Sequence, residues 1–378
     1  MKYKTGRTTL LHETVMLVAV LILPVSPVRA TTKPVAQGKA PEVLNVASPD
    51  KIIQYVRDRF QVPESVKLTV EPLRKSSYPA FYETVITSDD GKQKRTDSIF
   101  ITDDGRCFVM GNIFALTDGS SDEIIRCVRD AVKLPAAENL SVGPLEASAY
   151  PGFLKTTITA SEGDKKKTGE VYITRDHRTG VLGMVFPYRR DFVEQLISTK
   201  GQPSVGPANA KVTVVEYADL QCPTCALFQK TLENEILPKY SKRVRFVFKD
   251  FLIPSHDWSR TAAIANGCAF QIAPSTFVNY RTLIFAAQQS INATNVHERL
   301  LQLANDAGIN SEKLTACTAA DGSLGRIQSD IQEAQNLGVR GTPTLFVNGR
   351  IVVWTPPVPF EKILDDALAE ASGQAPKL

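Results

Sequence analysis

An internal duplication constrains what this chain can fold into more than any other feature of its sequence. Residues 52–114 align with residues 124–186 without a gap, and 27 of the 63 paired positions are identical. Unrelated segments of average composition would share about 4 positions. Because such copies should have the same local structure, each is predicted to be one supersecondary unit. We place the copies at about residues 49–118 and 121–190, within one domain of residues 49–192.

The residue pattern of the first copy predicts one helix followed by strands. Residues 52–60, IIQYVRDRF, have apolar side chains at helical spacing. The later segments KLTVEPL, FYETVIT, DSIFIT and CFVMGNIF are rich in β-branched and aromatic residues and are bounded by turns. We expect an α+β domain made of two tandem repeats with antiparallel strands. No convergent set of titratable residues is repeated, so two roles stay open: a scaffold or spacer, and docking of substrate or a second subunit.

The first thirty residues have the pattern of a cleaved secretory signal peptide. Lys2, Lys4 and Arg7 precede an apolar run at residues 15–25, and the small-x-small pattern VRA ends at Ala30. The apolar run is shorter than the roughly 20 residues that cross a bilayer, which argues against an uncleaved anchor helix. We expect cleavage near Ala30, a periplasmic or otherwise extracytoplasmic location, and a soluble mature protein.

Export sets the redox environment, because disulfides persist outside the cytosol. The segment that follows, residues 31–48, lacks periodicity and is predicted to be a flexible leader. The net charge of the whole chain is +4, of which the first thirty residues contribute four Lys and Arg against one Glu, or +3. The remaining +1 excludes a basic nucleic-acid-binding protein.

A second, different segment follows the duplicated domain. Residues 199–207, TKGQPSVGP, are rich in turn residues and are predicted to be a linker. Residues 212–217 then have the pattern of a buried strand, a helical stretch follows, and residues 244–248 return to strand. Residues 257–338 are almost wholly helical in pattern, and the chain ends with two strands around an Asn-Gly turn and an amphipathic helix. This order predicts an α/β domain.

A Cys-Pro-Thr-Cys motif lies at the first strand-to-helix junction of this segment. Cys222 would stand where unpaired N–H groups and the positive end of the helix dipole meet, which lowers a cysteine pKa from about 8.5 to roughly 3.5–7.5. We predict that Cys222 is the nucleophile and that Cys225, less exposed, resolves the mixed disulfide. The alternative, half of a zinc site, needs two more ligands, and the four histidines form no paired motif. We expect no metal and no cofactor.

Three motifs carry a family resemblance. They are VVEYADLQCPTC at residues 214–225, FKDF at 248–251 and GVRGTPTLFVNG at 338–349. Together they make residues 208–373 similar to the DsbA family of thioredoxin-fold thiol-disulfide oxidoreductases, most closely its Gram-positive and mycobacterial-type branch. The resemblance covers under half of the chain. It implies an α/β thioredoxin fold with a helical insertion.

The resemblance also implies roles for four residues outside the motif cysteines. Pro343 resembles the family's cis-proline, with Thr342 before it, where exposed backbone pairs with a substrate as a strand would. An ordinary strand start is the alternative for this dipeptide. Glu216 and Lys249 resemble the buried acid and its basic partner, which would move protons to or from Cys225. A purely structural ion pair is the alternative.

The dipeptide between the two cysteines departs from the strongest oxidants of the family. It is Pro-Thr, not Pro-His, so a second cationic neighbour of the thiolate is absent. Oxidation is implied by the family, whereas reduction and isomerisation stay open, because small differences in thiolate stability change the direction of a two-electron exchange.

Two disulfides are expected among the other cysteines. Members of the resembling branch often join two helices of the insertion, which implies a bond between Cys268 and Cys317; buried free thiols are the alternative. Cys107 and Cys127 have no cysteine counterparts in the other copy and flank the junction between the copies. We predict a bond between them that ties the last strand of one copy to the first helix of the next.

These observations predict an exported thiol-disulfide oxidoreductase. Its partners would be proteins with thiols or disulfides and a membrane or soluble redox protein, and nucleic acid is excluded. One alternative is a disulfide isomerase or reductase that forms a homodimer through the N-terminal domain. The other is a non-catalytic chaperone or binding module that keeps a thioredoxin core.

Overall fold

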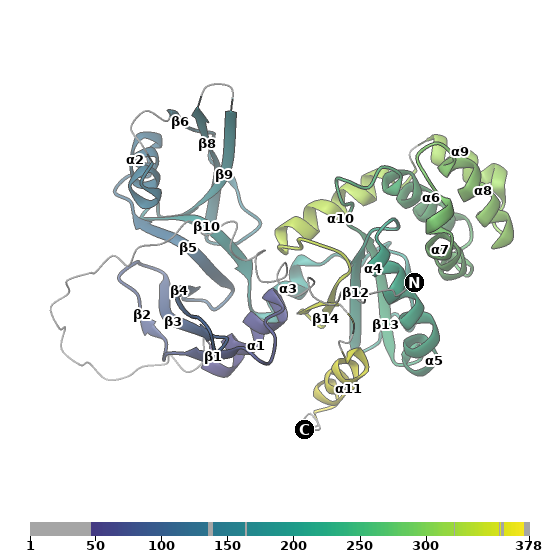
Figure 1. Cartoon of the computed structure of the whole chain (residues 1–378), viewed down its shortest axis with the longest axis horizontal. Helices are drawn as coiled ribbons and strands as arrows, with labels where there is room; N and C mark the ends of the chain where they lie inside the picture. The colour runs from purple at the N-terminus through teal and green to yellow at the C-terminus, as the bar shows by residue number, and fades with distance from the viewer. Residues whose placement is uncertain are drawn as a thin grey trace, which may run out of the picture.

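The computed structural model describes most of the chain after the predicted leader. The described residues are 47–134, 139–162, 165–320, 322–354, 356 and 359–373. The predicted signal peptide and residues 31–46 of the predicted leader lie outside the described residues. Figure 1 shows two parts side by side, a large twisted sheet and a helix-rich part, with the helices α1 and α3 between them.

Each copy of the repeat contains one helix followed by five strands. The first copy comprises α1 (Pro49–Phe60), β1 (Lys67–Val70), β2 (Arg74–Lys75), β3 (Phe81–Asp89), β4 (Lys94–Thr102) and β5 (Cys107–Ala115). The second comprises α2 (Ser121–Val132), β6 (Asn139–Val142), β7 (Glu146–Ala147), β8 (Phe153–Glu162), β9 (Lys165–Thr174) and β10 (Thr179–Pro187). A short helix, α3 (Arg190–Leu196), leads out of the second copy.

The two copies share one antiparallel sheet. The strand order is β1-β3-β4-β5-β10-β9-β8-β6, with β2 beside β3 and β7 beside β8. The copies therefore meet where β5 pairs with β10, and Gly111 lies opposite Gly183, its own counterpart in the repeat. An internal two-fold axis passes through this pair, because the pairs on either side of it correspond under the repeat: Phe108 faces Phe186, and their counterparts Gly180 and Phe114 face each other.

Neither glycine of this central pair has room for a side chain. A Cβ on Gly183 would lie 2.2 Å from the carbonyl oxygen of Met110, and one on Gly111 would lie 2.6 Å from that of Leu182. Gly111 also has a φ of 131°, which residues with a side chain rarely adopt. The repeated glycine is thus required by the close approach of the two copies.

The helices of the repeat bury equivalent apolar residues. In α1, Ile52 and Val56 face the sheet, and in α2 their counterparts Ile124 and Val128 do the same. Both helices begin with a serine whose side chain accepts a hydrogen bond from the first turn, which satisfies an otherwise unpaired N–H group. The shared sequence therefore specifies the same helix start and the same buried face twice.

The C-terminal part is built on a second, five-stranded sheet. Its strands are β11 (Ser204–Val205), β12 (Val212–Ala218), β13 (Val244–Asp250), β14 (Thr344–Val347) and β15 (Arg350–Val353). Its helices are α4 (Pro223–Thr231), a π-helical turn (Leu232–Ile236), α5 (Leu237–Tyr240), α6 (Ser259–Ile272), α7 (Phe277–Ala286), a 3-10 turn (Gln288–Ser290), α8 (Val296–Asp306), α9 (Ser311–Ala319), α10 (Leu324–Asn336) and α11 (Phe360–Ala371).

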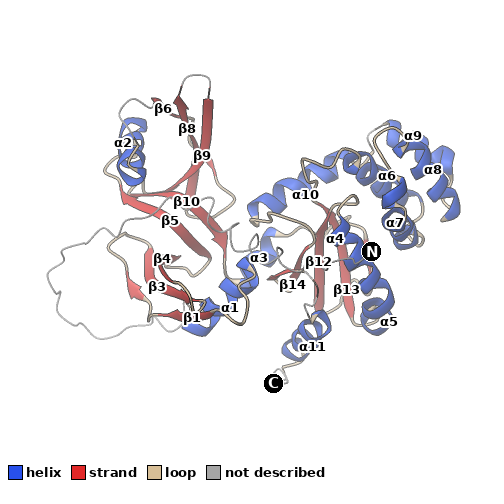
Figure 2. Ribbon diagram, in the orientation of Figure 1, coloured by secondary structure: helices blue, strands red, loops and turns tan. Residues whose placement is uncertain are grey.

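The order of these elements is the thioredoxin arrangement, which confirms the predicted fold class of this part. The sheet order is β11-β13-β12-β14-β15, in which β12 is parallel to β13 and antiparallel to β14. Helices α6 to α9 form the predicted insertion and pack on one another away from the sheet, as Figure 2 shows. None of the described helices combines the length and apolar character needed to span a membrane.

The two faces of this sheet are covered by different helices. On one face, Phe228 of α4 and Leu364 of α11 pack with Val214 and Phe246. On the other, α10 and α3 pack on the alternate residues of the same strands, which include Val215 and Val247. Because α3 belongs to the first part of the chain, the duplicated domain is joined to the thioredoxin part by shared apolar packing.

Candidate active site

Cys222 stands at the start of α4. It is the N-cap residue of the helix, with extended backbone angles, and Pro223 occupies the first helical position. The Cys222 N–H donates to the carbonyl oxygen of Asp219 at 3.0 Å, which fixes the turn between β12 and α4. The side chain of Cys222 is 8% exposed, whereas Cys225 is fully buried. Both are free thiols, and the outer one alone can meet a partner.

The surroundings of Cys222 favour its thiolate. Its pKa is lowered to about 5, chiefly by a hydrogen bond from the Cys225 thiol, with further contributions from Thr342 and from the N–H groups of Cys225 and Thr224. The pKa of Cys225 is raised well above its usual value by burial and by the neighbouring Cys222. The pair therefore divides into an ionised nucleophile and a protonated resolving thiol.

Thr342 and Pro343 lie against the nucleophile. The peptide bond between them is cis. The carbonyl oxygen of Thr342 lies 3.4 Å from the Cys222 sulfur. The hydroxyl of Thr342 is buried and has no hydrogen-bond partner among the described residues, so it is free to donate to the thiolate.

Gln288, which the sequence did not single out, braces the active-site turn. Its amide donates to the carbonyl oxygens of Leu220 at 2.8 Å and of Cys222 at 3.1 Å. It comes from the 3-10 turn after α7, so the helical insertion supports the loop that carries the cysteines. A lone glutamine in a polar stretch gives no sequence signal for this contact.

The partner of Glu216 is Arg281, and sequence reasoning missed it. Glu216 on β12 is 2% exposed, and its Oε2 accepts from Nη2 of Arg281 on α7 at 2.8 Å. Burial raises the pKa of Glu216, an effect that Arg281 opposes and that Cys222 increases. The other carboxylate oxygen, Oε1, is buried and has no partner among the described residues.

Arg281 is itself enclosed. Its Nε donates to the side-chain oxygen of Gln229 at 3.0 Å, and its guanidinium lies 4.9 Å from the ring centroids of both Phe248 and Phe285. The sequence gives one signal for this contact: Arg281 lies within the apolar helix sequence FVNYRTLIFA, which indicates a buried cation. A buried cation requires an acid nearby.

The predicted pairing of Glu216 with Lys249 is wrong. In the parallel pair of β12 and β13, Glu216 lies opposite Phe248, and Tyr217 lies opposite Lys249. Since successive side chains of a strand point to opposite faces, Glu216 and Lys249 are on different sides of the sheet. Glu216 faces α7, whereas Lys249 faces α10.

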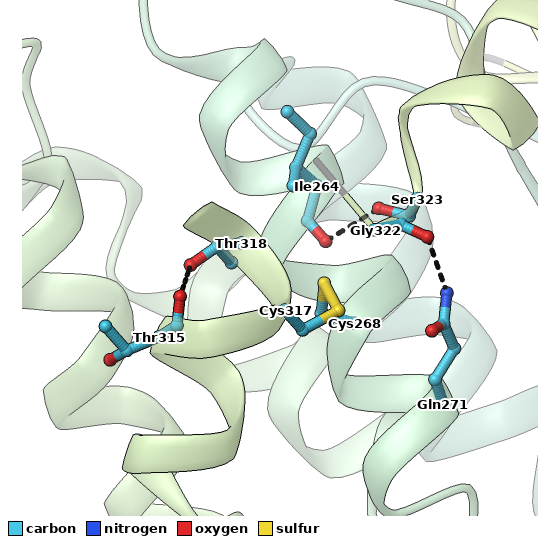
Figure 3. Close-up of a disulfide and its surroundings, with 8 residues drawn as sticks. All are labelled: Ile264, Cys268, Gln271, Thr315, Cys317, Thr318, Gly322 and Ser323. Carbon is cyan, nitrogen blue, oxygen red and sulfur yellow. Dashed lines mark hydrogen bonds between the residues drawn. A yellow bond between two sulfur atoms is a disulfide. The ribbon is translucent and has the colours of Figure 1, made fainter. Parts of the chain in front are cut away.

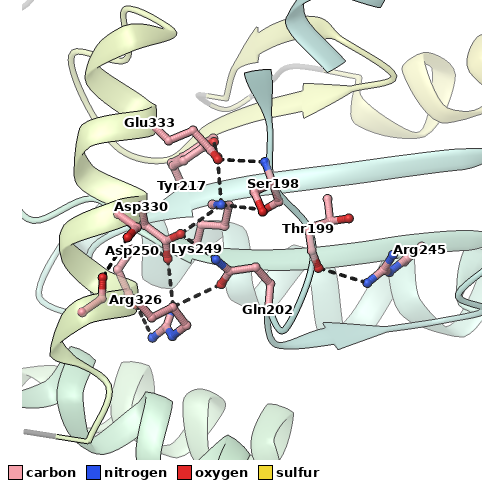
Figure 4. A network of polar contacts seen from close by, with 12 residues as sticks. Ser198, Thr199, Gln202, Tyr217, Arg245, Lys249, Asp250, Arg326, Asp330 and Glu333 are labelled. Atoms are coloured by element: carbon pink, nitrogen blue, oxygen red, sulfur yellow. Dashed lines mark hydrogen bonds and ion pairs between the residues drawn. The ribbon is translucent and has the colours of Figure 1, made fainter. Parts of the chain in front are cut away.

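Lys249 belongs to a buried network that holds the start of the linker. Its ammonium lies 2.9 Å from Asp330 and 2.8 Å from Glu333, both on α10, and donates to the carbonyl oxygen of Ser198 at 2.8 Å. Gln202 donates to Asp330 at 2.7 Å (Figure 4). Burial raises the pKa of Asp330 to about 6, against the opposing effect of Lys249. The charges of this network are structural and do not contact the cysteines.

A disulfide joins Cys268 of α6 to Cys317 of α9. The Cα atoms are 5.9 Å apart, and 49 residues separate the two cysteines in the sequence. Figure 3 shows Ser323 beside the bond, donating to the carbonyl oxygen of Ile264 at 2.9 Å. The bond ties together two helices of the insertion that braces the active-site turn.

The predicted disulfide between Cys107 and Cys127 is absent, and both are free thiols. Cys107 begins β5, whereas the Cys127 sulfur lies 3.8 Å from the carbonyl oxygen of Ala115 at the other end of that strand. Eight residue steps of a strand span roughly 26 Å, far beyond the roughly 7 Å limit for Cα atoms of a disulfide. The two cysteines lie on the predicted elements, β5 and α2, but next to opposite ends of β5, so they cannot form a disulfide.

The second part of the chain is similar to known proteins. Residues 198–366 match the family model described as Thioredoxin. Over 170 residues the chain is 29% identical to disulfide bond formation protein D of Bacillus subtilis, covering 43% of this chain and 74% of that protein. Over 146 residues it is 34% identical to Na(+)/H(+) antiporter NhaA 3 of Salinispora tropica, covering 38% of this chain and 21% of that protein.

A solved structure gives a similar match. The crystal structure of oxidised BdbD from Bacillus subtilis aligns with a TM-score of 0.42 and 26% identity, over 47% of this chain and 96% of that chain. The chain thus spans about a fifth of the antiporter and most of the disulfide bond formation protein. The C-terminal part is a thioredoxin-like domain similar to DsbA-like disulfide oxidoreductases, as its motifs indicated. The duplicated domain lies outside the matched family model.

Proposed function

We propose that the protein is an exported thiol-disulfide oxidoreductase that forms or exchanges disulfides in extracytoplasmic proteins through Cys222 and Cys225. The observation that carries the proposal is the unequal pair of thiols at the start of α4. The pKa of Cys222 is lowered to about 5, and that of Cys225 is raised well above its usual value. Similarity to disulfide bond formation protein D supports the same activity.

The reaction follows from this difference. In the oxidised protein a substrate thiolate attacks the Cys222 sulfur, so a substrate–Cys222 bond forms and the Cys222–Cys225 bond breaks. Cys225 leaves with the electron pair and takes up a proton. A second substrate thiolate then attacks the substrate sulfur of the mixed disulfide and releases Cys222 as a thiolate. The substrate gains a disulfide and the protein is reduced by two electrons.

The low pKa of Cys222 favours the oxidising direction. A thiolate that is stable at neutral pH is a good leaving group and stabilises the reduced protein, which makes the disulfide form an oxidant. This stabilisation is reached with Thr224 in place of a histidine between the cysteines, because Cys225, Thr342 and the first-turn N–H groups supply the donors. A redox partner of unknown identity must restore the disulfide.

Glu216 is suited to move the proton of Cys225. The Glu216 carboxylate increases the pKa of Cys225, which requires the two groups to be close, and its Oε1 has no other partner among the described residues. Arg281 holds the second oxygen, so the carboxylate is fixed with one oxygen free. We assign Glu216 as proton acceptor and donor for Cys225 and Arg281 as the residue that positions it.

A trapping experiment tests the function. The oxidised protein should convert reduced, unfolded ribonuclease to forms with disulfides, and Cys222→Ser should abolish this. Given ribonuclease with scrambled disulfides, Cys225→Ala should instead accumulate mixed disulfides through Cys222, because the Cys222 thiolate breaks a substrate disulfide and no Cys225 thiol remains to release it. Cys127→Ser is the matched control, because Cys127 is a free thiol outside the site, and it should retain full activity. A non-catalytic binding module would be supported if the unaltered protein left ribonuclease reduced and if Cys222→Ser suppressed aggregation of the unfolded ribonuclease as well as the unaltered protein does.

Recovery of activity by ribonuclease with scrambled disulfides distinguishes oxidation from isomerisation. The inner strands of the two copies pair within one chain, at β5 and β10, so a homodimer of the N-terminal domain would need another surface. Efficient isomerisation by a dimeric protein in light scattering would favour the isomerase alternative over the oxidase that we propose.

A further inference from the structure

The duplicated domain contacts the thioredoxin domain at the end of α10. Arg59, in the last turn of α1, is 8% exposed, and its Nη2 donates to the carbonyl oxygens of Leu337 at 2.7 Å and Gly338 at 2.9 Å. The hydroxyl of Tyr150, from the second copy, donates to the carbonyl oxygen of Asn336. Both copies therefore bind the three carbonyl groups at which α10 ends.

Carbonyl groups at a helix end have no partners within the helix, and they carry the negative end of the helix dipole. A buried guanidinium is a suitable partner because it supplies charge and several N–H groups in one plane. Arg59 forms no ion pair with a carboxylate among the described residues. Its guanidinium lies 4.1 Å from the ring centroid of Phe186, so the helix end and this ring compensate its burial.

Comparison of the two copies shows that the Arg59 contact is not part of the structure that they share. The counterpart of Arg59 in the second copy is Ala131, although Arg57 and Asp58 beside it are matched by Arg129 and Asp130. The second copy folds without an arginine at this position, so the fold of the repeat unit does not require Arg59. It is present only in the copy whose helix contacts α10.

The segment held by Arg59 leads directly to the redox site. Three residues separate Gly338 from Thr342, whose carbonyl oxygen lies 3.4 Å from the Cys222 sulfur. The same helix α1 also holds the chain beyond the site, because Asp58 binds Arg350 of β15 through two hydrogen bonds of 2.8 and 3.0 Å. Both flanks of the Thr342–Pro343 segment are thus attached to the duplicated domain.

We propose that Arg59 is a positioning residue for the redox site, through which the duplicated domain holds Thr342 and Pro343 against Cys222. This deepens the proposed function and rests on it for its kinetic consequence, since a substrate would dock on this segment. Without Arg59, the end of α10 and the segment after it are less ordered. The Thr342 hydroxyl then loses its fixed place beside the thiolate, and a docking substrate must order the segment itself.

The test compares variants of the full mature chain. In Arg59→Met, which keeps the apolar stem against Phe186, the Cys222 pKa measured by thiolate absorbance should rise by about one unit. Oxidation of reduced ribonuclease should become about tenfold less efficient, mainly through a higher KM, because ordering the segment becomes part of binding. Arg59→Lys should recover part of both effects.

Arg57→Met is the matched control. Arg57 lies on the same helix but donates to the carbonyl oxygens of Val62, Pro63 and Val66 within its own copy. This variant should lower stability and leave the Cys222 pKa and the KM unchanged. A merely structural role of Arg59 would give the same result as this control.

Gly338→Ala disturbs the contact from the other side. Gly338 has a φ of 69°, and a Cβ there would lie 1.9 Å from the Arg59 Nη2. It should reproduce the effects of Arg59→Met, and the double variant should be no worse than either single one. In the unaltered protein, the amide hydrogens of residues 339–342, 344 and 345 should exchange slowly with solvent. This measurement does not depend on whether a variant folds.

Four results would overturn the inference: a normal Cys222 pKa and KM in folded Arg59→Met, additive effects in the double variant, an equal response to Arg57→Met, or rapid exchange of the amide hydrogens of residues 339–342, 344 and 345. Failure of the proposed function looks different, because the unaltered protein would then leave reduced ribonuclease unchanged. The pKa and exchange measurements would still decide whether Arg59 positions the segment.

Discussion

The carbonyl oxygen of Thr342 lies 3.4 Å from the sulfur of Cys222, and the hydroxyl of the same threonine has no partner among the described residues. A thiolate cannot donate to the carbonyl, but it can accept from the hydroxyl. Ionisation of Cys222 should therefore satisfy a buried group that the thiol leaves unpaired. Thr342 is among the groups that lower the Cys222 pKa, after Cys225.

Thr342→Val tests this hydrogen bond. Valine has nearly the same shape but no hydroxyl, so the thiolate loses a donor and the Cys222 pKa should rise by about one unit, as expected for a hydrogen bond to a charged group. Thr342→Ser keeps the hydroxyl and is the control. Titration of thiolate absorbance in both variants measures the shift, and equal pKa values would contradict the role of the hydroxyl.

The pH dependence of the reduced protein should reflect Cys222. Its pKa is about 5 in the folded protein, below the ordinary 9.0, so ionisation stabilises the fold fully above pH 9 and the effect is lost as the pH falls through 5. Between these values stability should rise by at most about 1.4 kcal/mol per pH unit from this group. Alkylation of Cys222 should be half-maximal near pH 5, while Cys225 stays unreactive.

Urea unfolding of the reduced protein and of Cys222→Ala between pH 5 and 9 isolates this contribution. The difference in unfolding free energy between the two should increase with pH. A constant difference, or alkylation that begins only near pH 9, would show that Cys222 ionises like an ordinary cysteine.

Because Glu216 and Arg281 form a buried ion pair, substituting both should cost less unfolding free energy than the sum of the two single substitutions. Arg281→Met leaves a buried carboxylate unpaired, which should cost about 3–5 kcal/mol and raise the Glu216 pKa further. Adding Glu216→Gln removes the unpaired charge and should recover a large part of that loss. Chemical denaturation of the four proteins in this cycle measures the coupling, and additive losses would contradict the pairing.

In a mixed disulfide with a substrate that has a single thiol, release depends on attack by Cys225, and Glu216→Gln alone should slow it because Cys225 loses its proton acceptor. Glu333→Gln is the matched control, since Glu333 is a partly buried acid on the opposite face of the sheet, paired with Lys249. It should lower stability without changing the lifetime of the mixed disulfide. Equal lifetimes in the two variants would remove Glu216 from proton transfer.

The residues that the sequence located well are those defined by local patterns. Cys222 and Cys225 lie within four residues at a strand-to-helix junction, so their environment follows from the start of one helix. Pro343 is fixed by the short motif before β14. The environment of the two cysteines needs no knowledge of which strands are neighbours, whereas the position of Pro343 opposite them was implied by the family resemblance.

The errors concern contacts that depend on register and length. The family resemblance implied the pairing of Lys249 with Glu216, but a difference of one residue in register places the two on opposite faces of the sheet. Cys107 and Cys127 were joined because their elements are adjacent, but a nine-residue strand separates them. Arg281 was missed because it reaches Glu216 from 65 positions away, in a helix with no fixed spacing from the motif.

The internal two-fold axis yields a last prediction, at Gly183. A Cβ there would lie 2.2 Å from the carbonyl oxygen of Met110, so Gly183→Ala must push β5 and β10 apart. The loss of unfolding free energy should be at least about 1–3 kcal/mol, the range for overpacking. Gly169→Ala, on β9 with its nearest neighbour at 3.7 Å, should be nearly neutral. Because Arg59 and Tyr150 reach α10 from different copies, a folded Gly183→Ala protein should also have a raised Cys222 pKa. An unchanged stability would mean that the two glycines do not meet, and the internal axis would be wrong.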